Sequence, residues 1–471
     1  MAFNESNFFC MTRFGCYPIN RPFDGDVLSP FVTLTFYDND KRQITVGNKS
    51  NPPNNSAIIK SFQYGQSDGS GAEVEIYDEE GGDFKYFVDK IVKNPEEAKT
   101  EYKAVVQWGW ISASCGNSKN SISSQRSRCH QFSILTVDIN ISGKGIIFRL
   151  ELRDLMQPMF ETRITKVYNL TLKEAIRSMF RDATPAITDV QFKRSETEDF
   201  RFNGDVETKS AKFETNGLTP LAAAREWVSR YRTDRDKGII VFYDNLIDCA
   251  TGQDSTPPKV VFLEDPLPKC FEDKDRNCQF ANLGTYIVNG GKHSPVLSFD
   301  PKIKFNFSTA ARAAVVVGSE TSIAATGTGQ PCPPGGGGST EVGSGSSGMV
   351  QVTEDMNRLL GNKDAPRDAL RSQAANERAN KNYESVEAEM RIQGNPALDN
   401  IYDLITKTVS IIVINPFHLA NGGNGIDWLI PAPCNDILSN KNWRVKGVSH
   451  EVREGTYTTT LKLFLVSPGS N

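Results

Sequence analysis

The chain has 471 residues, 38% of them hydrophobic and 23% charged, which is enough for about three domains that each bury a core. Its formal net charge of −4 and the lack of a long Lys/Arg run argue against a protein that grips nucleic acid through phosphates. No apolar run approaches the ~18 residues of a membrane span, and the N-terminus has no signal-peptide pattern. We expect that the chain does not insert into a membrane and that it is assembled in a cytoplasm.

Residues 1–25 are expected to be an N-terminal extension, and residues 26–155 a first tube-like β-barrel domain. A helix is predicted where Phe84, Phe87, Val88 and Ile91 recur at helical spacing. Strands are predicted where β-branched and aromatic residues cluster between turn residues, at 31–37, 57–64, 72–76, 105–111, 132–141 and 146–152. The polar segment 112–128 is expected to be an exposed loop.

Residues 156–295 are expected to form a small α+β domain. The run from Thr171 to Glu174 is a capping box, which favours a helix start by ~1 kcal/mol. Thr219-Pro220 predicts a second helix that begins with proline. Residues 238–243 and 259–263 predict strands.

Residues 296–471 are expected to form a second tube-like β-barrel domain that carries an insertion. Residues 325–348 are nearly all Gly, Ser, Thr and Pro and cannot bury enough to offset their ordering entropy, so they predict a flexible segment. Residues 353–382 are polar and are expected to be helical in part. The predicted fold is mainly β: two tube-like antiparallel β-barrel domains in one chain, plus the small α+β domain.

The last strands of the chain predict a bulged antiparallel hairpin. Trp443 and Val445 share one parity while Val448, His450 and Val452 share the other, so Gly447 must absorb a phase slip as a bulge. Gly455 is expected at positive φ in the turn. Tyr457, Thr459, Leu461, Leu463 and Leu465 then line one face.

The two predicted β regions are faintly alike. Gly71-Ala-Glu-Val-Glu-Ile76 before a Gly-Gly turn parallels Val386-Glu-Ala-Glu-Met390 before Gly394. Convergent strand patterning imitates repeats easily, so the sequence leaves duplication open.

The hairpin pattern Val-x-Gly-Val-x-His, followed by Gly-x-Tyr-x-Thr-x-Leu-x-Leu, runs from Val445 to Leu463. It resembles the C-terminal signature of central baseplate hub proteins of contractile-tailed phages, and of the related late-control-D and injection-system spike-base proteins. Two upstream pieces are similar as well, 385–396 with its Gly394-Asn395-Pro396 turn, and 411–417. Together the three pieces span roughly 85 residues, a spacing that a chance match of common turns and strands does not favour.

The resemblance implies a non-enzymatic virion protein of the tail baseplate. It implies a homotrimer that joins the six-fold tail tube to the three-fold spike and forms part of the DNA channel. Implied partners are the tail tube protein, the spike protein, and baseplate wedge and sheath-proximal proteins, with DNA only in transit. Two alternatives stay open, a tail-associated cell-wall hydrolase and the spike base of a contractile injection system.

The sequence predicts no catalytic residues, no cofactor and no metal site. The four histidines show no His-Glu-x-x-His pattern, and the nine cysteines show no Cys-x-x-Cys. Free thiols are expected in a reducing cytoplasm, and if oxidation occurs the candidate pairs are Cys115–Cys129 and Cys270–Cys278. Candidate interface residues are Trp428, Phe417 and His450.

Overall fold

The computed structural model describes the chain between Leu28 and Leu465 with internal gaps. The undescribed ranges include 1–27, 113–125, 265–281, 326–340, 352–385, 414–440 and 466–471. The expected extension 1–25, the helical segment 353–382 and most of the insertion 325–348 fall in these ranges. No helix among the described residues is long and apolar enough to cross a membrane. The prediction of a mainly β chain with little helix is confirmed.

The first β unit is a closed seven-stranded barrel, in which β3 pairs with both β4 and β2 to complete the ring. Its strands are β1 (Leu28–Asp38), β2 (Lys41–Gly47), β3 (Ala57–Gln66), β4 (Ser70–Asp78), β5 (Tyr102–Ser112), β6 (Cys129–Ser142) and β7 (Gly145–Arg153). Helical residues at Phe84 and Val88 lie between β4 and β5, and both side chains are buried in the barrel core. Strand β2 is the element that the sequence pattern missed.

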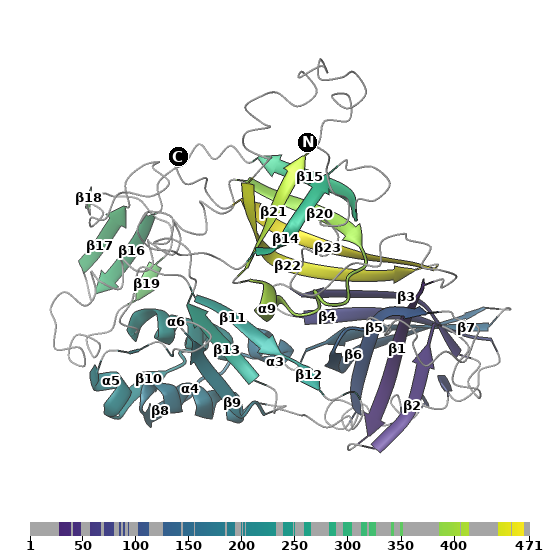
Figure 1. The fold of residues 1–471 in the computed structure, drawn as a ribbon. Coiled ribbons are helices and arrows are strands. Elements are labelled where there is room, and N and C mark those ends of the chain that lie inside the picture. Colours follow the sequence, from purple (N-terminus) through teal and green to yellow (C-terminus); the bar gives the residue numbers. More distant parts are fainter. Residues whose placement is uncertain are drawn as a thin grey trace, which may run out of the picture.

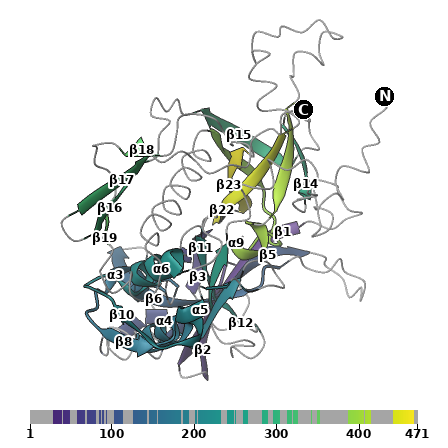
Figure 2. The same cartoon turned by 90° about the vertical axis from the view of Figure 1, so that its left-hand side faces the viewer.

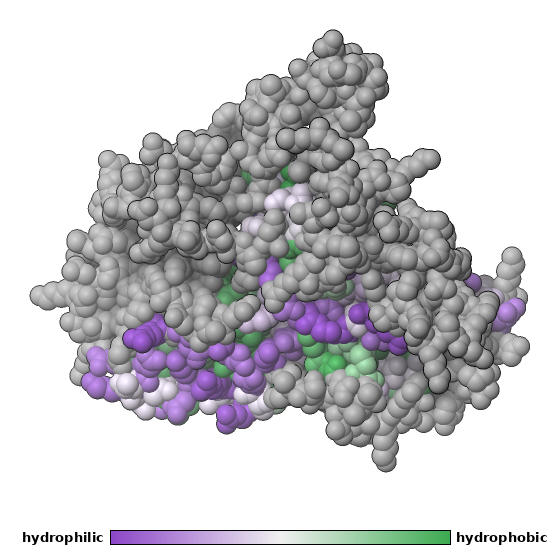
Figure 3. Space-filling view, viewed as in Figure 1, coloured by the Kyte–Doolittle hydropathy of each residue, from purple (hydrophilic) through white to green (hydrophobic). Residues whose placement is uncertain are grey.

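The α+β unit lies beside the barrel (Figure 1). Its elements are α3 (Gln157–Glu161), β8 (Val167–Leu170), α4 (Leu172–Arg181), β9 (Asp189–Lys193), α5 (Gly204–Thr208), β10 (Ala211–Glu214), α6 (Pro220–Tyr231), β11 (Ile239–Asp244), β12 (Leu246–Ile247) and β13 (Lys259–Glu264). Both predicted helix starts are confirmed. The Glu174 carboxylate accepts from the Thr171 amide at 3.3 Å and from its hydroxyl at 2.8 Å, and α6 begins at Pro220. The described surface of this unit is largely hydrophilic (Figure 3).

The second β unit follows the order β15-β20-β23-β22-β21-β14. Its elements are β14 (Asn282–Val288), β15 (Val296–Ile303), β20 (Val386–Gln393), α9 (Ile401–Leu404), β21 (Thr408–Val413), β22 (Lys441–Arg453) and β23 (Thr456–Leu465). The expected all-antiparallel arrangement of the two β units is wrong at two pairs, because β14 runs parallel to β21 and, in the first barrel, β2 runs parallel to β3. Strand β14 comes from the range 156–295 that was expected to form the α+β domain.

A separate four-stranded sheet of order β18-β17-β16-β19 lies within the insertion between β15 and β20. Its strands are β16 (Arg312–Val317), β17 (Glu320–Ala325), β18 (Glu341–Val342) and β19 (Met349–Gln351). The pair Glu341–Val342 therefore forms a short strand inside the range 325–348.

The C-terminal hairpin forms as its sequence predicts. The ladder between β22 and β23 shifts register between Val445 and Gly447, and Gly455 has a φ of 79°. Trp443 on one side of the bulge and Val448 on the other are both buried. The bulge therefore keeps apolar side chains on one face across the phase slip.

The two β units repeat one strand order. Neighbours are antiparallel throughout β3-β4-β7-β6-β5 in the first unit and β15-β20-β23-β22-β21 in the second. If the five strands of each set are numbered as they occur along the chain, both sets have the spatial order 1-2-5-4-3. Helical residues separate the second and third strands in both sets.

The registers and bulges of the two sets also coincide. Ala72 of β4 faces Leu152 of β7, and Ala388 of β20 faces Leu463 of β23. On its other side, Leu152 pairs with Ile134 of β6, and Leu463 pairs with Val445 of β22. In both strands a bulge follows directly after this residue. A second bulge also recurs at the same place in both sets. It follows Ile59 of β3, which faces Ile76, and Val296 of β15, which faces Ile392. The two β units are therefore repeats of one fold.

Candidate functional site: the buried junction of the two β units

Strand β22 belongs to both repeats. Its first residues pair with β21, and its last residues, Val448–Arg453, pair with Ser61–Gln66 of β3 in the first barrel. His450 lies opposite Tyr64 in this ladder. The second β unit therefore sits on the first through a continuous sheet, as Figures 1 and 2 show from two sides.

His450 lies at the centre of this junction and has no exposed surface. Its Nε2 is 3.0 Å from the Leu398 carbonyl oxygen, and its Nδ1 is 2.9 Å from the Tyr457 hydroxyl and 3.0 Å from that of Thr459. A carbonyl can only accept, so Nε2 carries the proton and Nδ1 accepts from a hydroxyl. The expected interface role of His450 is corrected, because its ring is enclosed within its own chain.

The Gly394-Asn395 turn packs against the same hairpin. The Gly394 amide donates to the Tyr457 carbonyl at 2.9 Å, and the Asn395 amide donates to the Thr459 hydroxyl at 2.8 Å. The Gly394 carbonyl accepts from the indole N–H of Trp110 at 2.8 Å, across the boundary between the repeats. A Cβ on Gly394 would overlap the Tyr457 ring. The turn and the hairpin, two of the pieces that carry the family resemblance, therefore meet at one place.

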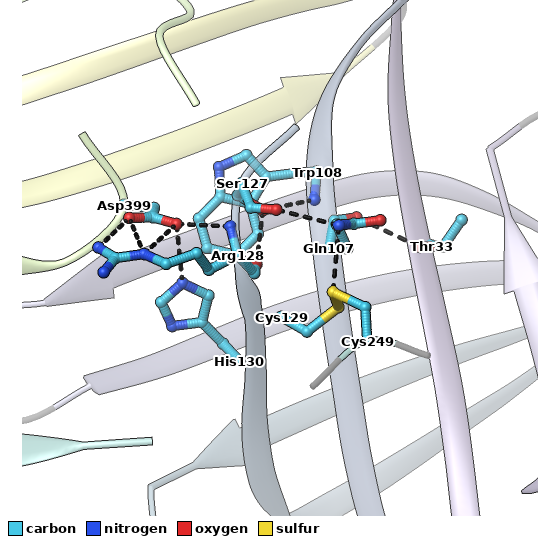
Figure 4. Close-up of a disulfide and its surroundings, with 9 residues drawn as sticks. All are labelled: Thr33, Gln107, Trp108, Ser127, Arg128, Cys129, His130, Cys249 and Asp399. Carbon is cyan, nitrogen blue, oxygen red and sulfur yellow. Dashed lines mark hydrogen bonds and ion pairs between the residues drawn. A yellow bond between two sulfur atoms is a disulfide. The ribbon is translucent and has the colours of Figure 1, made fainter. Parts of the chain in front are cut away.

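A buried carboxylate fastens the second unit to the first (Figure 4). Asp399, 2% exposed at its side chain, accepts from the Arg128 backbone amide at 2.6 Å and from its Nη2 at 2.6 Å. His130 Nε2 lies 3.5 Å from the second carboxylate oxygen. Arg128 Nη2 also reaches the more exposed Asp403 at 2.7 Å. Arg128 is thus held by a bidentate, charge-assisted contact of the kind that fixes geometry.

The electrostatics of this pair favour the charged forms. Burial by itself opposes ionisation of Asp399, but His130 and then Arg128 hold the pKa of its carboxyl well below the usual range. Burial likewise opposes the Arg128 cation, yet Asp399 and Asp403 raise the pKa of its guanidinium above the ordinary value.

Aromatic rings fill the space around these polar groups. Trp108 lies 4.7 Å from Tyr64, 4.9 Å from His130 and 5.1 Å from His450, measured between ring centroids. The Tyr64 hydroxyl donates to Gln66 Oε1 at 3.0 Å, and burial raises the pKa of that hydroxyl well above its ordinary value. The Ile401 amide donates to the same Gln66 oxygen at 2.8 Å, which adds a further bond between the units.

The α+β unit is joined to the barrel at the start of β6. Asn245 donates to the Gln131 carbonyl at 3.1 Å, and its Oδ1 lies 3.2 Å from His130 Nδ1. Cys129 forms a disulfide with Cys249, 120 residues away (Figure 4). The expectation of free thiols is therefore wrong for these two cysteines, and so is the candidate pair Cys115–Cys129, because the pairing of β6 with β12 brings Cys249 beside Cys129.

Non-reducing peptide mapping tests this pairing. We expect one disulfide-linked peptide that contains Cys129 and Cys249, and it should disappear after reduction. A linked peptide with Cys115 and Cys129 would contradict the arrangement.

The remaining predicted site residues are not brought together by the described structure. Trp428, Phe417, Cys115, Cys270 and Cys278 lie outside the described residues. The expected exposed loop 112–128 is wrong at its end, where Ser127 is buried and Arg128 pairs with Asp399. Among the described residues, no group of three or more His, Cys, Asp or Glu is placed to hold a metal.

Stability should depend on pH through His450. Burial, opposed by the hydrogen bond to Leu398 and the charge of Asp399 and aided by the nearby His130, lowers the pKa of its imidazole to about 4. The unfolded chain takes up this proton near pH 6.5 and the folded chain only near pH 4, so stability is lost as pH falls between these values. The loss should be on the order of 3 kcal/mol.

Urea unfolding between pH 7 and 4 measures this loss. His450→Gln, which can still donate to Leu398, should flatten the curve over that range. The contribution of Asp399 is separate, since a depressed carboxyl pKa costs stability only below about pH 4. An unchanged slope in the glutamine variant would contradict the role given to His450.

No protein-family description and no curated protein matches this chain. A tail protein from Neisseria meningitidis aligns over 92% of this chain and 96% of its own, at 10% identity and a TM-score of 0.46. A 43 kDa tail protein of prophage MuSo2 from Shewanella oneidensis aligns over 92% and 97%, at 10% identity and a TM-score of 0.44. A component of the type VI secretion system of E. coli, described as similar to T4 bacteriophage tail proteins, aligns over 89% of this chain and 77% of its own, at 9% identity and a TM-score of 0.39. These structural neighbours are tail proteins and a component of the type VI secretion system.

Proposed function

We propose that this chain is the central hub of a contractile phage tail baseplate, a structural adaptor between the six-fold tail tube and the three-fold spike. The observation that supports it is the internal duplication, with its shared strand order and two coincident pairs of bulges. Three copies of a chain with two equivalent β units offer six similar surfaces to a tube. The same three copies keep three-fold symmetry toward a spike.

The buried junction gives this adaptor its rigidity. Six β units match a hexameric ring only if neighbouring units keep a fixed angle. The bonds of Arg128 to Asp399, of Trp110 to the Gly394 carbonyl and of Ile401 to Gln66 link the two units of one chain, and they are mostly buried. Buried hydrogen bonds of this kind specify one arrangement of the groups that they join.

The resemblance of the hairpin supports the proposed partners, which are the tail tube protein, the spike protein and the wedge and sheath-proximal proteins. DNA would pass through the ring without being held, in keeping with the net charge of −4. The same duplication would also serve the alternative, the spike base of a contractile injection system. No described cluster favours the cell-wall hydrolase.

Copy number in purified tail particles tests the proposal. Quantitative mass spectrometry should find three copies of this chain per particle, and an antibody against it should label the end of the tail farthest from the capsid. Six copies, or labelling along the whole tail, would contradict a hub. Clearing of peptidoglycan by the purified chain, abolished by one Asp or Glu substitution, would favour the hydrolase.

A further inference from the structure

One short segment of the first barrel, residues 127–130, holds both of the other units of the chain. Toward the second β unit, the Arg128 backbone amide and guanidinium donate to Asp399. Toward the α+β unit, Cys129 is bonded to Cys249. Figure 4 shows the disulfide beside the contacts of Asp399. A change at the disulfide therefore acts on the backbone that positions Arg128.

Gln107 connects the disulfide to the same segment. Its side-chain amide donates to the Ser127 carbonyl at 3.0 Å and to Cys249 Sγ at 3.3 Å. Ser127 is also fastened to β5, because its amide donates to the Trp108 carbonyl at 2.8 Å and its hydroxyl accepts from the Trp108 amide at 3.0 Å. The Cys249 sulfur therefore belongs to the hydrogen-bonded set that places residues 127–130.

The two cysteines of this disulfide differ in exposure. Cys129 is 4% exposed and packs in a small buried cluster with Tyr37, Val105 and Ile247. Cys249, which follows β12, is an exposed residue. Thiol–disulfide exchange proceeds by attack of a thiolate on a sulfur atom that it can reach. A dissolved thiol can therefore open this bond at Cys249 and not at Cys129.

We infer that Cys129 and Cys249 form a redox-operated lock, which is open as two thiols in a reducing cytoplasm and closes after the chain leaves it. The change of surroundings rests on the proposed function, a particle component that is made inside a cell and acts outside it. Closing the lock ties the α+β unit to the barrel. It also fixes residues 127–130, so that Arg128 stays on Asp399.

A small-molecule disulfide such as oxidised glutathione serves as the oxidant. The Cys249 thiolate attacks one of its sulfurs, which forms a mixed disulfide at Cys249 and releases one small thiolate. The Cys129 thiolate then attacks Cys249 Sγ, forms the bond between the two cysteines and displaces the second small thiolate. The two protons lost by the protein thiols pass to the two released thiolates. Two protein thiols are thus oxidised and one small disulfide is reduced to two thiols, and opening follows the same steps in reverse.

Glutathione exchange on the native, oxidised full-length chain tests which sulfur reacts. Free thiols are first alkylated, reduced glutathione is added, and acid stops the reaction before peptide mapping. We expect glutathione on the Cys249 peptide in at least about tenfold excess over the Cys129 peptide, because only Cys249 is exposed. Adducts mainly on Cys129, or a bond that opens only in urea, would overturn the lock.

Two single variants compare the thiols directly. Cys129→Ala leaves the Cys249 thiol at the surface, whereas Cys249→Ala leaves the Cys129 thiol buried. With oxidised glutathione, native Cys129→Ala should form its mixed disulfide at least about tenfold faster than native Cys249→Ala. Circular dichroism checks that both variants fold, and if either does not, the exchange on the unsubstituted chain decides. Equal rates in two folded variants would contradict the assigned order of steps.

Hydrogen exchange of the oxidised and the reduced chain tests the coupling to Arg128. Reduction should speed amide exchange in residues 127–131 and in β12 at least about tenfold more than in the β23 residues around Leu461. Equal acceleration everywhere would mean that the bond acts only on global unfolding. Absence of any acceleration would mean that it constrains nothing. Either result overturns the lock.

Alkylation at the moment of cell lysis tests the timing. Chain from the cytoplasm should carry the alkylating label on both Cys129 and Cys249, and chain from released particles should be labelled there only after reduction. A bond already closed in the cytoplasm, or free thiols at these positions in released particles, would overturn the lock. Neither result alters the copy number in particles, which decides the proposed hub separately.

Discussion

Replacing Asp399 with asparagine is expected to lower the free energy of unfolding by about 3 kcal/mol, because the Arg128 guanidinium then loses its buried counter-charge. Both carboxylate oxygens of Asp399 accept hydrogen bonds from Arg128. In asparagine one of them becomes an NH2 group, which is itself a donor and cannot accept from an Arg128 N–H. Arg128 is 44% exposed at its side chain, so water and Asp403 recover part of the loss. Urea unfolding at pH 7 measures the change.

Asp403→Asn is the matched control. Asp403 contacts the same Arg128 nitrogen at a similar distance, 2.7 Å against 2.6 Å, but is 35% exposed rather than 2%. Exposed ion pairs contribute at most about 1 kcal/mol, so this variant should change little. Equal losses in the two variants would show that burial of Asp399 does not set its contribution.

Gly394→Ala is expected to cost about 3 kcal/mol, since the new methyl group must displace the Tyr457 ring from a close-packed junction. Displacement of Tyr457 removes its hydroxyl from His450, and movement of the turn breaks the bond between Trp110 and the Gly394 carbonyl. Thermal unfolding followed by tryptophan fluorescence reports both losses, because Trp110 is part of the junction.

Gly65→Ala provides the comparison at the same junction. A Cβ on Gly65 would meet only the Ser449 Cβ at 4.0 Å, an ordinary contact, so the change in stability should stay within about 0.5 kcal/mol. A tolerated alanine at Gly394 would mean that the turn does not pack against the hairpin as described.

The parts of this fold that could be predicted from the sequence are those set by neighbours in the chain. The Gly447 bulge, the Gly455 turn and the helix starts at Thr171 and Pro220 depend on a few adjacent residues. The apolar face that includes Tyr457 and Leu461 follows from the two-residue period of a strand.

The junction could not be predicted in this way, because its partners are far apart in sequence. Arg128 and Asp399 are 271 residues apart, and Cys129 and Cys249 are 120 apart. Neither pair leaves a local pattern. The proximity of Cys115 to Cys129 in sequence suggests a pairing, but Cys129 is bonded to Cys249 instead.

The duplication was only faintly visible in the sequence for a related reason. What the repeats share is strand order, register and bulge position, and few side chains are the same beyond Ala72 and Ala388 or Leu152 and Leu463. The insertion between β15 and β20 has no counterpart between β3 and β4, which follow each other closely. A fixed sequence period is therefore lost.

A density map of the distal tail at a resolution that separates strands tests the central proposal most directly. It should show three copies of this chain, with both β units of each copy in one ring that abuts the tail tube. Six copies in the ring, or a ring that contains only one β unit from each chain, would contradict the proposed hub.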